Sequence, residues 1–512
     1  MMNHIPSSSD KASVKDWLGL SVLALACVLY VMDLTVLHLA VPQISAKLKP
    51  SSAQLLWIID IYGFMVAGFL VTMGTLGDRI GRRKLLLFGS AAFGLVSVLA
   101  AYSSSAEMLV LNRAILGIAG ATIAPSTLSL IFSMFRNPKE RSFAIAIWIS
   151  AFSAGSGLGP VLGGIVLEHY WWGAVFLLAL PVMVLLLLLG PFILPEYKNE
   201  KAGSIDLLSV LLSLLGILPF IYSFKKVAQG GLTWDAVFSF FTGILFIYLF
   251  LKRQSRLEDP LIDLSLFKVK SFNAALMVNV MVVFIAFGYF LFVAQFLQLI
   301  LGLSPFVAGL WSLPSALAFI AGSNLVPRLT VKVKPAYVIA GCIGLAGTGL
   351  IILSGVSLKN GLVVVISASV IISLGLAPVF GLTTELIVGS APEEQSGSAS
   401  GIAETASELG GAIGISILGS IGTYFFRERF SGDSLKAIDP EKVEAARDTL
   451  GAALEVANTL ESIYKEKLIA AAQQGFISGM KTASVMCAAL AVVAIMVTLS
   501  LLKNVGGAKN EL

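Results

Sequence analysis

Acidic side chains stand inside strongly apolar segments at four places in this sequence: Asp33, Asp60, Glu404 and Glu408. An ionised carboxylate is costly in such surroundings, so each of these residues is a functional candidate. A carboxylate enclosed by apolar side chains holds either a proton or a cation, and each ligand discourages the other. These residue types therefore predict chemistry in which a proton and a cation compete for the same group.

Glu404 and Glu408, in GIAETASELGGAIGIS, are four residues apart and so share one face of a helix. Two carboxylates so close do not both ionise easily, and one is expected to stay protonated. The glycines that follow would let a neighbouring helix approach closely. Those glycines are Gly410, Gly411 and Gly414. Glu385 lies nearer the end of its own apolar segment, and its role is left open.

The stretch LVLNRAILG places Arg113 inside another apolar segment. A buried arginine costs about 3 kcal/mol or more unless it is paired, so Arg113 is expected to face the interior of the protein. Its candidate partners are a carboxylate in segment 17–41 or backbone carbonyls freed from helical bonding. Two interpretations stay open, a structural ion pair and a role in proton coupling.

Aromatic and imidazole side chains accompany these acids. Trp57 and Tyr62 flank Asp60, where their rings could attract an organic cation; the alternative is ordinary core packing or an interfacial belt. His38 follows Asp33 by five residues, which puts the two on different helix faces. A packing histidine and a proton relay are both compatible with that position.

The segments that carry these residues are long enough to cross a membrane. Of the 512 residues, 57% are hydrophobic and only 13% charged, and the mean hydropathy is +0.90. Apolar runs of about 20 residues recur, the length that spans a bilayer as a helix. The sequence therefore predicts an all-α polytopic membrane protein with fourteen spans, near 17–41, 55–76, 85–104, 107–133, 143–167, 173–195, 205–224, 235–251, 272–301, 305–326, 336–355, 361–387, 398–424 and 478–502.

Lys and Arg concentrate in alternate loops, such as 77–86, 134–142 and 252–271. This bias predicts that both termini are cytoplasmic. The long segment 425–477 would then lie outside. Its apolar residues have helical spacing, and Pro440 is placed near a helix start. A solvated helical hairpin and a lid over an outward-facing cavity are the two interpretations.

Several functional classes are not supported. There is no GxxxxGK[ST] loop for ATP, no nucleophile–base pair and no metal-type cluster, so neither an enzyme nor a cofactor is expected. Cys27, Cys342 and Cys487 fall inside predicted spans without metal-ligand spacing. The net charge of +5 reflects loop topology and indicates no nucleic acid partner.

The loop after the second span reads GTLGDRIGRRK, from Gly74 to Lys84. Gly74 and Gly81, with Gly77 between them, allow close backbone approach. Asp78 could accept hydrogen bonds from a helix N-terminus or an arginine. The bases are Arg79, Arg82, Arg83 and Lys84. A positive-inside anchor would explain the bases but not the Gly/Asp/Gly spacing.

The stretch GSGLGPVLGG contains small residues at a spacing of four, Gly155, Gly159 and Gly163. They form a flat helix face on which another helix can pack. Pro160 removes one backbone hydrogen bond and permits a bend. Simple packing and a seam that slides or seals during transport are both possible interpretations.

These motifs resemble those of a known family. GTLGDRIGRRK, LVLNRAILGIAGA and GSGLGPVLGG resemble motifs of the major facilitator superfamily, and MDLTVLHLAVP and QFLQLILGLSPFVAGLWSLP resemble motifs of its fourteen-helix drug:proton antiporter group. Within that group, the sequence is similar to exporters of quaternary ammonium compounds and methyl viologen. His38 stands where the group has an asparagine. LPSALAFIAGSNL lacks the further acid of some relatives, which leaves dication handling open.

The resemblance implies two six-helix bundles related by pseudo-twofold symmetry, with two helices inserted between them. The units would be a cytoplasmic tail (1–16), an N-terminal bundle (17–195), the inserted helices (205–251) and a C-terminal bundle (272–502) with an extracellular hairpin (425–477). It also implies coupling roles for residues matching Asp33 and Asp60, and cation recognition by those matching Glu404 and Glu408.

The resulting hypothesis is a monomeric, proton-driven antiporter of the bacterial plasma membrane. Its partners would be small lipophilic cations, protons and membrane lipids, and export would confer drug or antiseptic resistance. The alternatives are a proton-coupled transporter of one physiological solute, such as a siderophore or an amino-acid derivative, and a transport-inactive sensor.

Overall fold

The computed structural model describes residues 11–503, apart from 51, 199–205, 231, 258–259, 331–332, 393–394, 431–437 and 448–449. Within the helices, the side chains of residues 34, 38–39, 41–42, 45–46, 52–53, 55–56, 60, 156, 160, 225, 228–230, 305 and 327 also lie outside the described part. The described residues form helices and no strands. Fourteen helical segments are long and apolar enough to cross a membrane, as the sequence predicts.

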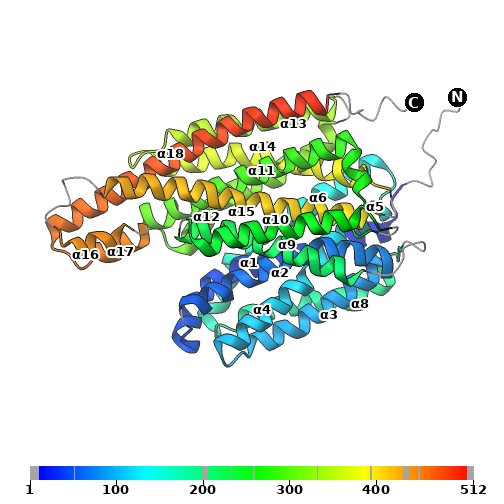
Figure 1. Cartoon of the computed structure of the whole chain (residues 1–512), viewed down its shortest axis with the longest axis horizontal. Helices are drawn as coiled ribbons and strands as arrows, with labels where there is room; N and C mark the ends of the chain where they lie inside the picture. The colour runs from blue at the N-terminus through cyan, green and yellow to red at the C-terminus, as the bar shows by residue number, and fades with distance from the viewer. Residues whose placement is uncertain are drawn as a thin grey trace.

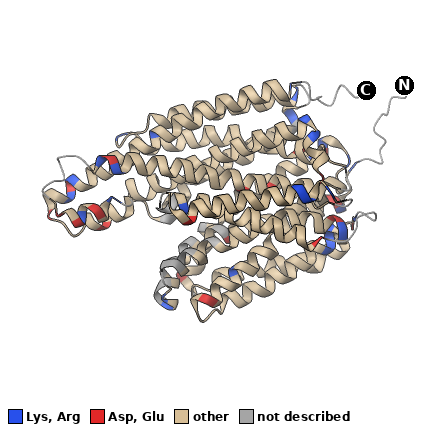
Figure 2. Cartoon of the chain, viewed as in Figure 1, with Lys and Arg blue, Asp and Glu red and all other residues tan. Residues whose placement is uncertain are grey.

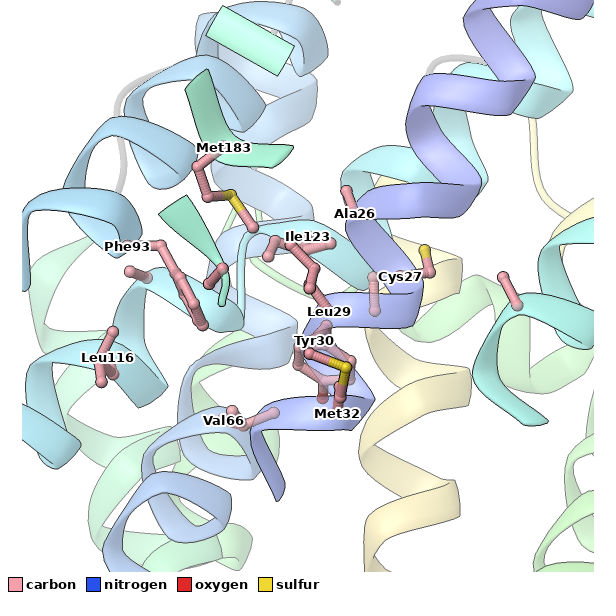
Figure 3. Close-up of a cluster of buried hydrophobic side chains, with 14 of the residues drawn as sticks. Ala26, Cys27, Leu29, Tyr30, Met32, Val66, Phe93, Leu116, Ile123 and Met183 are labelled. Atoms are coloured by element: carbon pink, nitrogen blue, oxygen red, sulfur yellow. The ribbon is translucent and has the colours of Figure 1, made fainter. Parts of the chain in front are cut away.

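The first half of the chain forms one bundle (Figure 1, blue to cyan). Its helices are α1 (Val14–Leu48), α2 (Ser52–Ile80), α3 (Arg82–Ala101), α4 (Ala106–Gly120), α5 (Ile123–Met134), α6 (Pro138–His169), α7 (Ala174–Leu177) and α8 (Leu180–Ile193). The pairs α4–α5 and α7–α8 each make up one span with a short interruption. Side chains from α1, α2, α3, α4, α5 and α8 meet in its apolar core (Figure 3).

The second half forms the other bundle (Figure 1, green to red). Its helices are α11 (Lys270–Gln295), α12 (Pro305–Leu329), α13 (Pro335–Ser354), α14 (Gly361–Gly389), α15 (Ser396–Arg429) and α18 (Ser462–Leu501). A π-helical turn, Phe296–Ile300, continues α11. This bundle has its own core of buried apolar side chains. The inserted helices α9 (Leu207–Gly230) and α10 (Trp234–Gln254) pack on each other, and α9 contacts both α2 and α15.

Two spanning helices extend into the hairpin predicted at 425–477. α15 continues to Arg429 and α18 begins at Ser462, while α16 (Pro440–Ala446) and α17 (Leu450–Ala457) lie between them. Pro440 opens α16, as predicted, and the Asp439 carboxylate accepts from the Glu441 amide at 3.0 Å. Most charged residues lie near the two ends of the long helices, this hairpin included, with few between them (Figure 2).

The end opposite this hairpin, where α2 ends and α3 begins, is called here the α2–α3 end. The two bundles meet there through α2 against α15 and through α6 against α12 and α14. These contacts position the candidate residues described next.

Candidate functional site

A buried ion pair joins α1 to α4. An Arg113 Nη1 hydrogen is donated to the Asp33 carboxylate, and Arg113 Nε donates to the Ile58 carbonyl of α2 at 3.3 Å. Arg113 is fully buried, and the Asp33 side chain is only 8% exposed. The two partners expected from sequence, a carboxylate of the first span and a backbone carbonyl, are therefore both present. The coupling role itself stays a prediction.

Aromatic rings enclose the guanidinium of Arg113. Its Cζ lies 4.7 Å from the centre of the Tyr62 ring and 5.9 Å from that of Phe176. Such stacking favours a cation. A Cβ at Gly117 would meet the Tyr62 carbonyl at 2.5 Å, so the glycine lets α4 approach α2 at this level. Nη2 of Arg113 has no hydrogen-bond partner within the described part of the chain.

Asp60 and His38 belong to α2 and α1, but their side chains lie outside the described residues. The roles predicted for them stay predictions.

A second set of acids comes from the other bundle. Glu404 and Glu408 are half-buried on α15, about 12 and 18 Å from its first residue at 1.5 Å per residue. Both lie within electrostatic range of the hydroxyl of Tyr30 in α1, and Glu408 lies within that range of Tyr62 as well. Carboxylates from one bundle thus lie opposite the aromatic interior of the other.

The predicted packing of α15 is found on α11. A Cβ at Gly410 or Gly414 would clash with backbone carbonyls of α11, those of Val280 and Phe284. Between the two glutamates, Ser407 Oγ donates to Asn279 Oδ1 at 2.9 Å. These contacts hold the face with the glutamates in one orientation.

Tyr30 links the two sets of acids. Its backbone carbonyl accepts from the Tyr62 hydroxyl at 3.4 Å, and the two rings lie 6.3 Å apart. The Phe152 ring of α6 stands edge-on to Tyr30 at 6.0 Å. From the sequence, Tyr30 was one of several aromatic residues that could attract a cation, and Trp57 and Tyr62 were favoured over it; its position three residues before Asp33 was a signal in its favour.

Trp57 does not share this interior. Its ring lies 6.5 Å from Tyr222 of α9 at an interplanar angle of 9°, and 6.0 Å from Phe64. The side chain is 42% exposed. Trp57 and Tyr62, which the sequence prediction treated together, therefore lie in different surroundings: Trp57 packs on α9 and Tyr62 lies over Arg113.

The glycine face of α6 packs on α1, the helix that carries Asp33. Cβ atoms at Gly155, Gly159 and Gly163 would collide with Val28, Thr35 and Val36. The close packing predicted from GSGLGPVLGG is confirmed, whereas its role as a sliding seam stays a prediction. The side chain of Pro160 lies outside the described residues, and α6 runs through that position.

At the α2–α3 end, Asp78 of α2 caps the first turn of α15. Its carboxylate accepts from the Gly397 amide at 3.2 Å and the Ser398 amide at 2.9 Å, and from Arg82 Nε at 3.1 Å. Both kinds of donor foreseen for Asp78, a helix N-terminus and an arginine, are present. Gly74 lies directly against the Gly397 carbonyl.

The neighbouring residues of this loop complete its structure. Gly81 has φ +114°, a conformation that favours glycine. Arg82 also donates to the Ser129 carbonyl at 3.3 Å and lies 4.4 Å from the Tyr197 ring centre. Arg79 donates to the Pro260 carbonyl at 3.5 Å.

Glu385, left open by the sequence, contacts the N-terminal bundle. The Ser142 hydroxyl of α6 lies 2.8 and 2.9 Å from the two carboxylate oxygens of Glu385 in α14. Deeper along α6, Ser150 Oγ lies 2.8 Å from Ser323 Oγ of α12. The contact of α6 with α12 and α14 therefore also includes polar side chains, like the contact of α2 with α15.

Comparisons with known proteins agree with this architecture. Residues 23–415 match the family model of the Major Facilitator Superfamily. The chain is 40% identical to the multidrug efflux pump LfrA of Mycolicibacterium smegmatis, over 95% of this chain and 96% of that protein. It is 32% identical to the methyl viologen resistance protein SmvA of Salmonella typhimurium, over 90% and 93% of the two chains.

Among solved structures, the human organic anion transporter MFSD10 (TETRAN) superposes with a TM-score of 0.58 at 16% identity, covering 94% of this chain and 99% of that one. At that identity the likeness concerns the fold alone. The family model and the similarity to LfrA carry the assignment: the chain belongs to the Major Facilitator Superfamily, whose members are membrane transporters.

Proposed function

We propose that this protein is a proton-coupled antiporter that exports lipophilic organic cations across the bacterial plasma membrane. The observation that carries the proposal is the placement of acids from both bundles around one aromatic interior. Asp33 is paired with Arg113 in the N-terminal bundle, while Glu404 and Glu408 of α15 lie within electrostatic range of Tyr30. Carboxylates and aromatic faces are the groups that recognise a delocalised cation.

The two sets of acids would have different roles in transport. Protonation of Asp33 removes the charge that pairs with Arg113, so proton binding and release change how α1 and α4 are held together. Glu404 and Glu408 would attract the cation, and their closeness makes protonation of one of them easy when no cation is bound. Proton and cation would thus oppose each other across the interface between the bundles.

The relatives support the substrate class. LfrA is named a multidrug efflux pump and SmvA a methyl viologen resistance protein. Methyl viologen is an aromatic organic cation, the kind of solute that the acids and rings favour. The proposal includes a cytoplasmic α2–α3 end with both termini inside, a monomer, and a drive from the proton gradient without a cofactor.

The experiment uses everted membrane vesicles that contain the full chain. The vesicles are energised until a ΔpH-sensitive dye is quenched, and ethidium or a quaternary ammonium compound is then added. Dose-dependent dequenching is expected from the wild-type protein and not from Asp33→Asn, compared at equal amounts of folded protein in the membrane. The matched control is Asp235→Asn, whose carboxylate is exposed at the start of α10.

Two results would contradict the proposal. Dequenching that persists unchanged in Asp33→Asn would remove Asp33 from the coupling path. No dequenching with any organic cation, from protein present at normal amounts, would favour a transporter of a single physiological solute.

A further inference from the structure

The strap of residues 260–263, which follows α10, contacts both bundles in addition to the contacts that α9 makes with α2 and α15. The carbonyl of Leu261 accepts from Thr75 Oγ1 of α2 at 3.0 Å and from Ser398 Oγ of α15 at 3.3 Å. Thr75 and Ser398 belong to different bundles. A single carbonyl oxygen, with two lone pairs, therefore bridges the seam between them.

The strap is itself held in place by Gln254, the last residue of α10. Gln254 is buried, and its Oε1 accepts from the amides of Leu261 at 2.6 Å and Ile262 at 3.4 Å. Its Nε2 donates to Ser209 Oγ near the start of α9 at 2.7 Å. One side chain thus connects both inserted helices to the strap, so the Leu261 carbonyl has a fixed direction.

Further contacts of the strap reach both bundles. On the α2 side, Arg79 Nη2 donates to the Pro260 carbonyl at 3.5 Å. On the α15 side, Gln395 Nε2 donates to Asp263 Oδ2 at 3.3 Å. The apolar side chains of the strap are buried in a cluster that includes Val71 of α2 and Ala399 of α15.

We propose that the strap is a latch between the bundles: held by Gln254, it joins α2 to α15 through the Leu261 carbonyl and thereby stabilises the state in which the α2–α3 end is closed. Alternating access requires the two bundles to separate at each end in turn. When α2 and α15 separate, Leu261 cannot keep both hydroxyl partners. The inserted pair thus contributes to the equilibrium between the two states of the transporter, whatever solute is carried.

The Thr75 hydroxyl has one hydrogen, which it also directs to the Val71 carbonyl of its own helix at 2.9 Å. When the α2–α3 end opens and the strap contact is lost, the Thr75 hydroxyl therefore still has the Val71 carbonyl as its acceptor. The Ser398 amide donates to Asp78 and its hydroxyl donates to the Leu261 carbonyl of the strap. Ser398 thus takes part in both contacts between α15 and its neighbours at this end.

The test measures how often this end opens. A cysteine is placed at Ala399, which is fully buried in the seam, after Cys27, Cys342 and Cys487 are replaced by alanine. Its rate of reaction with a membrane-permeant maleimide, in full-length protein in lipid nanodiscs, follows the fraction of open molecules. A second reporter, Ala100→Cys, is buried in the core of the N-terminal bundle away from the seam and reports general loosening.

Thr75→Val and Ser398→Ala are each expected to speed the labelling of Ala399→Cys about two- to tenfold, the effect of one net hydrogen bond. Gln254→Leu should also speed the labelling of Ala399→Cys, although it removes neither the Thr75 nor the Ser398 hydroxyl. The matched controls are Thr72→Val, whose hydroxyl has no partner in the described part of the chain, and Ser400→Ala, whose hydroxyl bonds only within α15 at 2.7 Å. Labelling of Ala100→Cys should not change.

Labelling of Ala399→Cys at the rate of the two controls would overturn the latch. A parallel rise at Ala100→Cys would also overturn it, because the substitutions would then loosen the whole fold. Since this readout involves no organic cation or proton flux, it can fail or succeed independently of the proposed function.

Discussion

Gly74 of α2 and Gly397 of α15 lie in direct backbone contact, although they are more than 300 residues apart in the sequence. A Cβ on Gly74 would overlap the carbonyl oxygen of Gly397, and a Cβ on Gly397 would stand 2.7 Å from the Gly74 carbonyl. Neither obstacle is a flexible side chain, so neither can move aside without shifting a helix. The closed α2–α3 end therefore depends on glycine at both positions.

Gly74→Ala is expected to favour opening at this end and to reduce transport by about tenfold or more, because overpacking of this kind costs about 1–3 kcal/mol. Gly63→Ala is the control, since no atom lies within 4 Å of a Cβ at that position of the same helix. Drug accumulation in cells, with protein amounts measured in parallel, checks the result. Normal export by Gly74→Ala would mean that the helices adjust freely.

The buried pair of Arg113 and Asp33 predicts an asymmetric response to substitution. Removal of one partner leaves an unpaired buried charge and should destabilise the fold by about 3–5 kcal/mol. Arg113→Gln and Asp33→Asn are therefore each expected to lower the thermal unfolding midpoint by more than half of the loss seen in the double variant.

Thermal unfolding followed by size-exclusion chromatography measures this difference. Lys226→Gln is the control, because Lys226 and Asp235 form an exposed pair at 3.6 Å, which should contribute little. If the double variant loses as much stability as the two single variants together, the charges are independent and the pair has no energetic coupling.

Glu404 and Glu408 are predicted to recognise positive charge. Conversion of either to glutamine removes a carboxylate that could carry the negative charge near Tyr30, and should weaken ethidium binding about tenfold, the effect of one poorly screened charge at short range. The polarised fluorescence of ethidium, titrated with purified protein, measures the affinity. Ser407→Ala, between the two, is the control for a disturbed helix, because its hydroxyl bonds Asn279 and not the glutamates.

Equal affinity in Glu404→Gln, Glu408→Gln and the wild type would assign cation recognition to other groups. A loss in Ser407→Ala of the same size would instead indicate that the orientation of α15 matters more than its charge.

The sequence predicted the spans because about 20 apolar residues in a membrane have few alternatives to a helix. It also restricted the partners of Arg113 to few groups. It could not name the partner of a small-residue face: the glycines before Asp78 mark a close approach, but nothing local shows that α15 is the helix that approaches. Tertiary packing decides that.

The separation of Trp57 from Tyr62 could have been predicted. Trp57 and Tyr62 are five residues apart, so a helix turns them about 140° from one another. Helical periodicity alone therefore separates Trp57, which stacks on Tyr222, from Tyr62, which lies over Arg113. The contact with α9 itself could not be foreseen, because the sequence does not show where the inserted helices pack.

The inserted helices offer a prediction about pH. Arg253 of α10 donates a hydrogen bond to Asp206 at the start of α9, at 2.6 Å, and this bond lowers the pKa of Asp206 to about 2. A carboxylate whose pKa is depressed on folding contributes stability above its unfolded pKa of about 4, and that contribution is lost as the pH falls from about 4 towards 2. The contact should therefore help fix the start of α9 to the end of α10 at neutral pH.

Asp206→Asn is expected to lower the thermal unfolding midpoint by a constant amount above about pH 5, and by progressively less below about pH 4. The difference between wild type and variant is measured across this range by nanoscale fluorimetry in detergent. Glu455→Gln serves as control, because its carboxylate is exposed on α17 and has no hydrogen bond or ion pair within the described residues. A difference that stays constant down to pH 3 would show that Asp206 acts through packing and not through its charge.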